Sequence, residues 1–257
     1  MKNVGGPIVE LARLTWEEAQ TLLELGAVAL LPTGATEPHG PHLPLDTDVL
    51  IAHTAAVRAA TALLNAGPRA LVLPPLAYAV TEYANGFAGA LSLPVATARA
   101  LVRDVVLSAM RAGFRGVVVC NAHLEPANLD ALRGGVDDAV AAGARAVFPD
   151  VTRKPHALTL GEEFKSGACH AGRYETSLVL AADPFLVREV ATTLEPNEIS
   201  LSRAIRDGKK TFLEAGGPRA YFGDPAAASA AEGEAHYAAL VAIFAAAARE
   251  LVRPEQL

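Results

Sequence analysis

The 257-residue chain is 51% hydrophobic, and its mean hydropathy of +0.26 is typical of a well-buried globular protein. Its formal charge is −6, and no Lys or Arg cluster exceeds the pairs at 153–154 and 209–210, which argues against nucleic acid or an anionic membrane as a partner. No apolar stretch reaches the ~20 residues that span a bilayer, and no signal peptide is recognisable. We therefore expect a single domain over residues 1–257, located in the cytoplasm, that binds a small molecule.

The predicted elements alternate between helix and strand from the N-terminus onward. Thr15 and Glu18 have the spacing of a capping box, which predicts a helix that runs to about Leu25. The apolar run at 27–32 is typical of a buried parallel strand. Helical periodicity follows over 48–64, with Thr47 as the predicted N-cap, so Asp48 is expected in the first helical turn.

The alternation continues through most of the chain. Further strands are expected at 70–73, 116–120 and 144–148, and further helices at 94–112, 126–142, 176–182 and 226–252. This order predicts an α/β fold in three layers, a sandwich in which a mostly parallel sheet has helices on both faces. The loop that ends at Leu93 is long enough to suggest a functional role, whereas 149–168 and 196–225 are predicted to be irregular.

A polar cluster follows the first predicted strand directly. Glu37, His39 and Asp48 are side-chain types that bind Zn²⁺ or Mn²⁺, and nearby prolines stiffen the loop that carries them. The alternative is a polar loop with incidental charges. For His42 and Asp46 we favour such a role, in which they shape the loop by hydrogen bonding or support the ligands.

The 116–120 strand ends in the same way, because Asn121, His123 and Glu125 follow it. Parallel strands place their carboxyl ends at one edge of the sheet, so the two polar clusters are expected to converge there. Together they supply five possible ligands, which suits two metal ions that share a bridging carboxylate better than one closed tetrahedral site. We take a dinuclear centre as the working hypothesis.

Three motifs resemble those of the creatininase (creatinine amidohydrolase) family. The first is EPHGPHLPLDTD at 37–48, the second is NAHLE at 121–125, and the third is HAGRYETS at 170–177. They occur in the family's order and at about its spacing. The resemblance covers the chain from about Leu14 to Asp183.

The resemblance implies a metal-dependent hydrolase that cleaves an amide-type C–N bond. It implies that Glu37 and His123 bind one divalent ion, that His39 and Glu125 bind the other, and that Asp48 binds both. The ions would be Zn²⁺ or Mn²⁺. It further implies that His170 acts as acid or base near the metals, with Glu175 close by, and that the protein assembles as a homohexamer.

The chain also departs from creatininases at positions that bear on the substrate. Creatininases use tryptophans before the third motif to orient a flat ring, but this chain has a single tryptophan, Trp16, and Leu124 replaces an aromatic residue. We therefore predict an amidohydrolase that is a poor creatininase. A more polar substrate is expected to contact basic residues of the segment 149–168, before the third motif, namely Arg153, Lys154, His156 or Lys165. Formamides, small peptides and sugar-derived ketones or lactones stay open as substrates, as does creatinine itself.

Two further alternatives belong to other classes. Cys169 could act as a nucleophile with His170 as its base, but adjacent residues of an extended chain point in opposite directions. The protein could also be a metal-binding subunit without activity, which the retention of all five ligands and of His170 argues against. Nothing in the sequence beyond residue type suggests a role for His53, His156 or His236.

Overall fold

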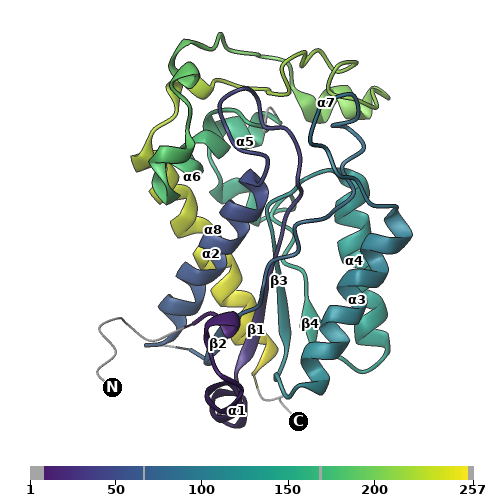
Figure 1. The fold of residues 1–257 in the computed structure, drawn as a ribbon, viewed down its shortest axis with the longest axis vertical. Helices are drawn as coiled ribbons and strands as arrows, with labels where there is room; N and C mark the ends of the chain where they lie inside the picture. The colour runs from purple at the N-terminus through teal and green to yellow at the C-terminus, as the bar shows by residue number, and fades with distance from the viewer. Residues whose placement is uncertain (1–8, 66, 168–169, 254–257) are drawn as a thin grey trace.

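A computed structural model describes residues 9–65, 67–167 and 170–253 (Figure 1). At its centre lies a four-stranded sheet in the order β2 (Ala70–Val72), β1 (Val28–Thr33), β3 (Val117–Asn121) and β4 (Ala146–Val147). All three strand pairings are parallel. The predicted α/β class and the parallel sheet are confirmed.

Helices cover both faces of the sheet, as predicted (Figure 1). One face packs against α3 (Val95–Arg111) and α4 (Pro126–Ala141), and the other against α2 (Thr47–Leu63), α6 (Arg173–Ala182) and α8 (Ala230–Leu251). The two cores are separate because successive strand side chains point to opposite faces. In β1, for example, Leu30 belongs to the core under α2 and α8, and Leu31 belongs to the core under α3.

The helix ends follow local hydrogen bonding. α1 (Trp16–Glu24) begins with the predicted capping box, since the Thr15 backbone N–H donates to the Glu18 carboxylate at 2.7 Å and the Thr15 hydroxyl accepts from the Glu18 backbone N–H at 3.3 Å. The predicted N-cap of α2 was wrong by one residue. Thr47 is already helical, and its hydroxyl donates to the Pro44 carbonyl at 2.7 Å, while the side chain of Asp46 at the cap makes no capping bond.

The C-terminal helix finds its partner surface within the chain. The apolar face of α8, including Leu240, Ile243 and Phe244, is buried against α2 and α6. This face therefore does not by itself require a second subunit. In residues 9–65, 67–167 and 170–253, no helix combines the length and apolarity that a membrane span requires.

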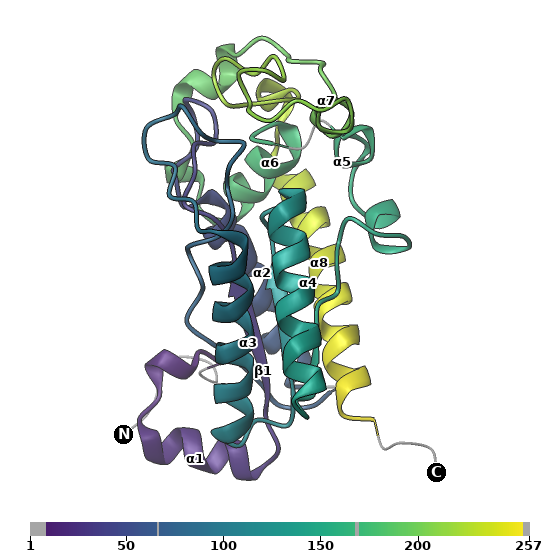
Figure 2. The same ribbon diagram turned by 90° about the vertical axis from the view of Figure 1, so that its right-hand side faces the viewer.

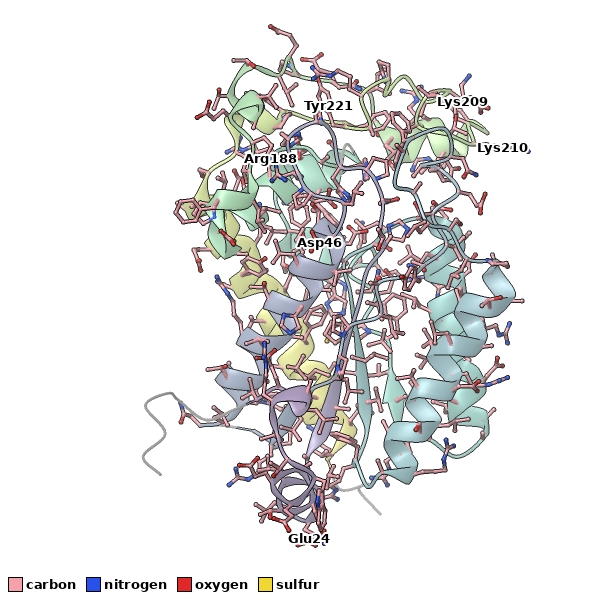
Figure 3. All side chains as sticks on the ribbon, viewed as in Figure 1. Glu24, Asp46, Arg188, Lys209, Lys210 and Tyr221 are labelled. Atoms are coloured by element: carbon pink, nitrogen blue, oxygen red, sulfur yellow. The ribbon has the colours of Figure 1, made fainter. Side chains whose placement is uncertain are left out.

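The two segments predicted to be irregular contain short helices above the sheet (Figure 2). These are α5 (Glu162–Ser166) and α7 (Leu201–Arg206). Isolated turns of 3₁₀-helix occur at Leu11–Arg13, His156–Thr159, Pro184–Leu186, Glu189–Thr193 and Pro225–Ala227. Lys209 and Lys210, which follow α7, lie at the upper edge of the molecule (Figure 3). We call α5, α7 and their junction the rim.

Candidate metal centre

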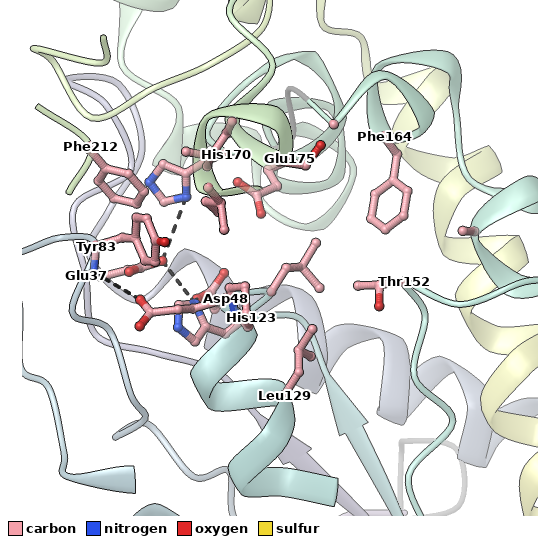
Figure 4. A pocket seen from close by; sticks show the side chains of 18 of the residues that line it. Glu37, Asp48, Tyr83, His123, Leu129, Thr152, Phe164, His170, Glu175 and Phe212 are labelled. Atoms are coloured by element: carbon pink, nitrogen blue, oxygen red, sulfur yellow. Dashed lines mark hydrogen bonds and ion pairs between the residues drawn. The ribbon is translucent and has the colours of Figure 1, made fainter. Parts of the chain in front are cut away.

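Five buried side chains, those of Glu37, His39, Asp48, His123 and Glu175, converge above the carboxyl ends of β1 and β3, and all of them except His39 are labelled in Figure 4. The loop after β1 carries Glu37 and His39 and ends at α2, whose first turn contains Asp48. His123 follows β3 directly, and Glu175 lies in the first turn of α6. Each side chain is therefore delivered by the end of a strand or the start of a helix, as in open α/β sheets generally.

Close approach of the backbone brings these elements together. Gly34, at the end of β1, lies against the first turn of α2, where an added Cβ would be 2.8 Å from the Asp48 Cβ. Thr33 donates its hydroxyl hydrogen to the Asn121 side-chain oxygen at 3.0 Å, which connects the ends of β1 and β3. The Asn121 amide nitrogen donates in turn to the His123 carbonyl at 2.6 Å. The first two motifs are thus held to each other by the sheet.

Three buried histidines share one arrangement. In each of them, one ring nitrogen lies within hydrogen-bonding distance of a main-chain carbonyl. The pairs are His39 Nδ1 with Glu37 O at 3.1 Å, His123 Nε2 with Val80 O at 2.8 Å, and His170 Nε2 with Pro38 O at 2.9 Å. Because a carbonyl oxygen only accepts, each of these nitrogens carries the hydrogen, and the other nitrogen faces the carboxylates. Outer hydrogen bonds of this kind orient metal-binding histidines.

Asp48 lies between two of these imidazoles. Its Oδ1 is 3.2 Å from Nε2 of His39, and its Oδ2 is 3.0 Å from Nδ1 of His123. Glu37 Oε1 lies 3.1 Å from the same His123 nitrogen, and Glu175 Oε2 lies 3.7 Å from the His39 nitrogen. Two triads of donor atoms result, Glu37–Asp48–His123 and His39–Asp48–Glu175, each with its atoms within 4.8 Å of one another. Asp48 belongs to both.

The charges of this cluster favour a bound cation. Burial opposes a charge on His39, but the carboxylates of Asp48, Glu175 and Glu37 outweigh it and raise the pKa of His39 to about 10. Burial also raises the pKa of Glu175 to about 8. Carboxylates this crowded and this far from water need neutralising partners, and buried charges are normally paired or bound to metals. The oxygen and imidazole donors suit Zn²⁺ or Mn²⁺.

A turn with an unusual backbone aims the third motif at the cluster. Ala171 has a φ of 49°, in the left-handed region that residues other than glycine seldom adopt. In this conformation its backbone N–H donates to Glu175 Oε2 at 2.6 Å. The neighbouring His170 and Glu175 are thereby fixed relative to each other. Backbone strain of this kind persists where the surrounding structure holds it in place.

Glu125 lies beside the cluster but outside the two triads, and it is also outside the third donor group that the described residues form, Glu37–His39–His170. Its two carboxylate oxygens accept the backbone N–H groups of Glu82 and Tyr83, both at 3.1 Å. Burial nevertheless raises the pKa of Glu125 to about 7. The long loop before Leu93, for which a functional role was predicted, thus positions Glu125. The hydroxyl of Thr81, in the same loop, also donates to the Glu37 carboxylate.

His170 has its free nitrogen turned toward the cluster, 3.8 Å from Glu37 Oε1, and it forms the third donor group with Glu37 and His39. Its ring is stacked on Phe212 with centroids 4.2 Å apart (Figure 4). Burial, reinforced by the charge of His39, lowers the pKa of His170 to about 4. Its position allows it either to exchange a proton or to contact a metal.

The other residues considered in the sequence analysis are not members of the cluster. His42 is buried and pairs with the Thr176 hydroxyl at 2.9 Å, which links the first motif to α6. Asp46 is exposed. His53 lies 3.2 Å from Glu10, and His236 packs against the Tyr174 ring. Cys169, the alternative nucleophile, lies outside the described residues.

A pocket of about 450 Å³ opens above the cluster. Glu37, Asp48, His123 and Glu175 form its floor, with Glu125 and His170 beside them. Figure 4 shows Phe212 and Tyr83 on one side of the space and Phe164 and Thr152 on the other.

The basic residues of the pocket differ in part from those expected. Lys165 lines it, whereas Arg153, Lys154 and His156 do not. Arg206 and Phe212 also line it, and both come from a segment predicted to be only a connection. No periodicity marks these two residues as site residues, since their placement depends on how the rim packs.

The comparisons with known proteins agree with this geometry. Residues 12–248 match the family model for creatininase, described as creatinine amidohydrolase. The chain belongs to the creatininase family. The resemblance indicated by the three motifs is therefore confirmed, and with it a metal-dependent hydrolase.

Relatives of this creatininase-family chain carry two kinds of name. It is 35% identical over 221 residues to the mycofactocin precursor peptide peptidase of Mycobacterium tuberculosis, an alignment that covers 82% of this chain and 80% of that protein. It is 32% identical over 200 residues to the creatinine amidohydrolase of Pseudomonas putida, covering 70% and 74%. A crystal structure of creatinine amidohydrolase matches with a TM-score of 0.78 and 28% identity, covering 97% of this chain and 100% of that one.

Proposed function

We propose that this chain holds two divalent metal ions and hydrolyses an amide bond. One ion would be bound by Glu37, Asp48 and His123, and the other by His39, Asp48 and Glu175. The observation that carries the proposal is the position of Asp48, whose two oxygens face two different imidazoles, each with its other ring nitrogen bonded to a carbonyl. This assignment replaces Glu125 with Glu175 beside His39, because Glu125 is held away by two backbone N–H groups.

When bound, two such ions supply a Lewis acid for the substrate carbonyl and lower the pKa of a shared water toward neutrality. The protein must then carry a proton to the leaving nitrogen. Two side chains face the pocket beside the ligands, His170 through its free Nδ1 and Glu125 through a fixed carboxylate. We propose that these two groups handle the proton.

The substrate we propose is a peptide-like amide rather than creatinine. Trp16, the single tryptophan of the chain, is 73% exposed on α1, at the end of the molecule opposite the rim (Figures 1 and 2), so it cannot orient a ring in the pocket of its own chain. Leu124 lines the pocket instead of an aromatic residue. The pocket volume of about 450 Å³ lies within the range of pockets that hold drug-sized ligands. The relative from Mycobacterium tuberculosis, 80% of which the alignment covers, is named as a peptidase, which also favours a peptide substrate.

The decisive experiment combines metal analysis with a substrate panel. Protein loaded with Mn²⁺ or with Zn²⁺ should contain close to two ions per chain, and it should cleave short peptides faster than creatinine. Formamides and lactones belong in the panel because the family resemblance leaves them open. Creatinine turnover equal to that of the best peptide would contradict the peptide assignment, and one ion or none after loading would contradict the dinuclear centre.

Assembly, location and domain organisation stay predictions. We propose a single catalytic domain over the whole chain, a cytoplasmic location and a homohexamer. Light scattering coupled to size exclusion tests the last of these, because a mass near the 26.7 kDa of one chain would contradict it.

A further inference from the structure

The two ends of the pocket differ in their polar groups. Its floor carries the carboxylates of Glu37, Asp48 and Glu175 with the imidazole of His123, whereas the rim contributes two cationic residues, Lys165 from α5 and Arg206 from α7. Between the ends lie apolar side chains, including Leu129, Phe164, Leu201 and Ile205. A molecule that reaches from the floor to the rim therefore passes from a reactive centre, over an apolar wall, to a positive charge.

The two helices that carry these cations are joined directly. The Ser202 backbone N–H donates to the Gly167 carbonyl at 3.0 Å, and the Ser200 hydroxyl donates to the Ser166 carbonyl at 2.8 Å. Gly167 has a φ of 79°, and a Cβ there would collide with the Ser202 hydroxyl. Lys165 and Arg206 consequently belong to one assembled surface.

Neither cation is strongly neutralised by the protein. Lys165 Nζ is 2.8 Å from Glu162 Oε1, but the Glu162 side chain is 91% exposed, so water screens the pair and a competing anion can replace it. Arg206 forms no ion pair with any residue in the described part of the chain, whereas Arg203 in the same helix faces Asp207 at 4.0 Å. A guanidinium left without a partner at the edge of a pocket suits a carboxylate, which it can bind with two parallel hydrogen bonds.

We propose that Lys165 and Arg206 bind a carboxylate of the substrate, while the amide to be cleaved lies over the floor. The substrate class is thus a short peptide with an apolar stretch and an anionic group at some distance from the scissile bond. This inference rests on the proposed amide hydrolysis and adds the feature by which the substrate is selected. The anion is either the peptide's terminal carboxylate or an acidic side chain.

The probes are leucine- and alanine-containing peptides of two to five residues, each prepared as the free acid and as the C-terminal amide. A second set carries an N-terminal succinyl group, which places the carboxylate at the other end. In the set whose carboxylate reaches the rim, the peptide with the carboxylate should have a lower KM than the same peptide without that charge. The two kcat values should be similar. Arg206→Gln and Lys165→Gln should each raise that KM by about three- to tenfold and leave the neutral peptide unaffected.

Arg203→Gln is the matched control, because Arg203 lies on α7 but does not line the pocket. It should leave both KM values unchanged. Arg206→Glu should reverse the preference, so that a peptide with a lysine amide at its end becomes the better substrate. Equal KM values for acid and amide at every length, or equal effects of Arg203→Gln and Arg206→Gln, would overturn the inference.

Calorimetric titration of the same probes separates this inference from the proposed activity. If no peptide is cleaved, the amide hydrolysis fails. The rim is then still tested by whether the acid binds more tightly than the amide and whether Arg206→Gln removes the difference. Tighter binding of the acid that disappears in the variant supports the rim site, and equal binding contradicts it.

Discussion

The floor and the rim of the pocket are built in contrasting ways. Most of the floor is placed by regular elements: Asp48 and Glu175 lie in the first turns of α2 and α6, and His123 lies just beyond the end of β3, while Glu37 lies in the loop between β1 and α2. Main-chain groups hold His123 and Glu175 in place. The rim consists of helices of five and six residues whose cations are exposed. Rigid elements position a reactive centre more accurately than loops do, and loops vary more readily. The contrast therefore assigns the chemistry to the floor and the choice of substrate to the rim.

The largest effect is expected from Asp48→Ala on the floor. This substitution removes the one carboxylate that both triads share, so two cations would face each other without a charge between them. Loss of groups that merely support metal ligands already costs about 10- to 100-fold in metal affinity. We expect Asp48→Ala to lose at least one ion by elemental analysis and more than about a hundredfold in kcat.

Asp46→Ala is its control. Asp46 lies two positions away, is exposed and makes no capping bond with its side chain. It should keep two ions and the activity of the unaltered protein. Equal metal contents in the two variants would remove the basis for a bridging role of Asp48.

A smaller but more discriminating effect is expected from two glutamates. Glu175→Gln alters a member of the His39–Asp48–Glu175 triad, so it should lower the metal content toward one ion per chain. Glu125→Gln alters a pocket residue outside the triads, so it should retain both ions and lower kcat by about a hundredfold, the usual scale for a proton-transfer group. Elemental analysis with peptide hydrolysis distinguishes them. The reverse pattern would return Glu125 to the ligand set implied by the family resemblance.

These two glutamates also show which parts of the candidate site can be predicted from the sequence. Strand ends followed by Glu37, His39 and His123 can be recognised from apolar periodicity, because parallel topology brings such ends to one edge. Position along the chain could not decide between Glu125 and Glu175. The proposed choice of Glu175 rests on the left-handed turn at Ala171 and on N–H groups from a loop over forty positions before Glu125, which are tertiary features without a local signal.

The rim was least predictable for a similar reason. Short helices such as α5 and α7 have little propensity signal, and most of their stability comes from packing. Arg206 is placed by α7, which is hydrogen-bonded to the end of α5, and Phe212 is placed by its backbone N–H, which donates to the Tyr83 carbonyl at 2.8 Å. The sequence does predict the sheet, its covering helices and the location of the centre, since each of these follows from long periodic segments.

A moderate effect confined to the rim is expected from Gly167→Ala. The added methyl group would meet the Ser202 hydroxyl in a backbone conformation that already disfavours alanine, so α5 and α7 should separate. Gly143→Ala is the matched control, because Gly143 has a similar φ of 92° but open space around it. Both should lose about 1 kcal/mol of folding free energy through the backbone. Gly167→Ala alone should raise the KM for anionic peptides several-fold.

Metal content should be unchanged in both glycine variants. Thermal unfolding, elemental analysis and peptide kinetics together test this. If Gly167→Ala released metal as well, the floor and the rim would be one mechanical unit rather than two.

The smallest effect is expected at Trp16. This side chain is 73% exposed on α1, beyond the amino ends of the strands, whereas the pocket opens at their carboxyl ends. Trp16→Ala should therefore leave metal content, peptide kcat and peptide KM unchanged. The unaltered protein should likewise show no change in tryptophan fluorescence when a peptide binds, because Trp16 is the only tryptophan of the chain. A fluorescence change on addition of creatinine or peptide would mean that Trp16 of a neighbouring copy lies near the substrate within an assembly. It would weaken the argument that this chain lacks the aromatic surface needed to orient creatinine.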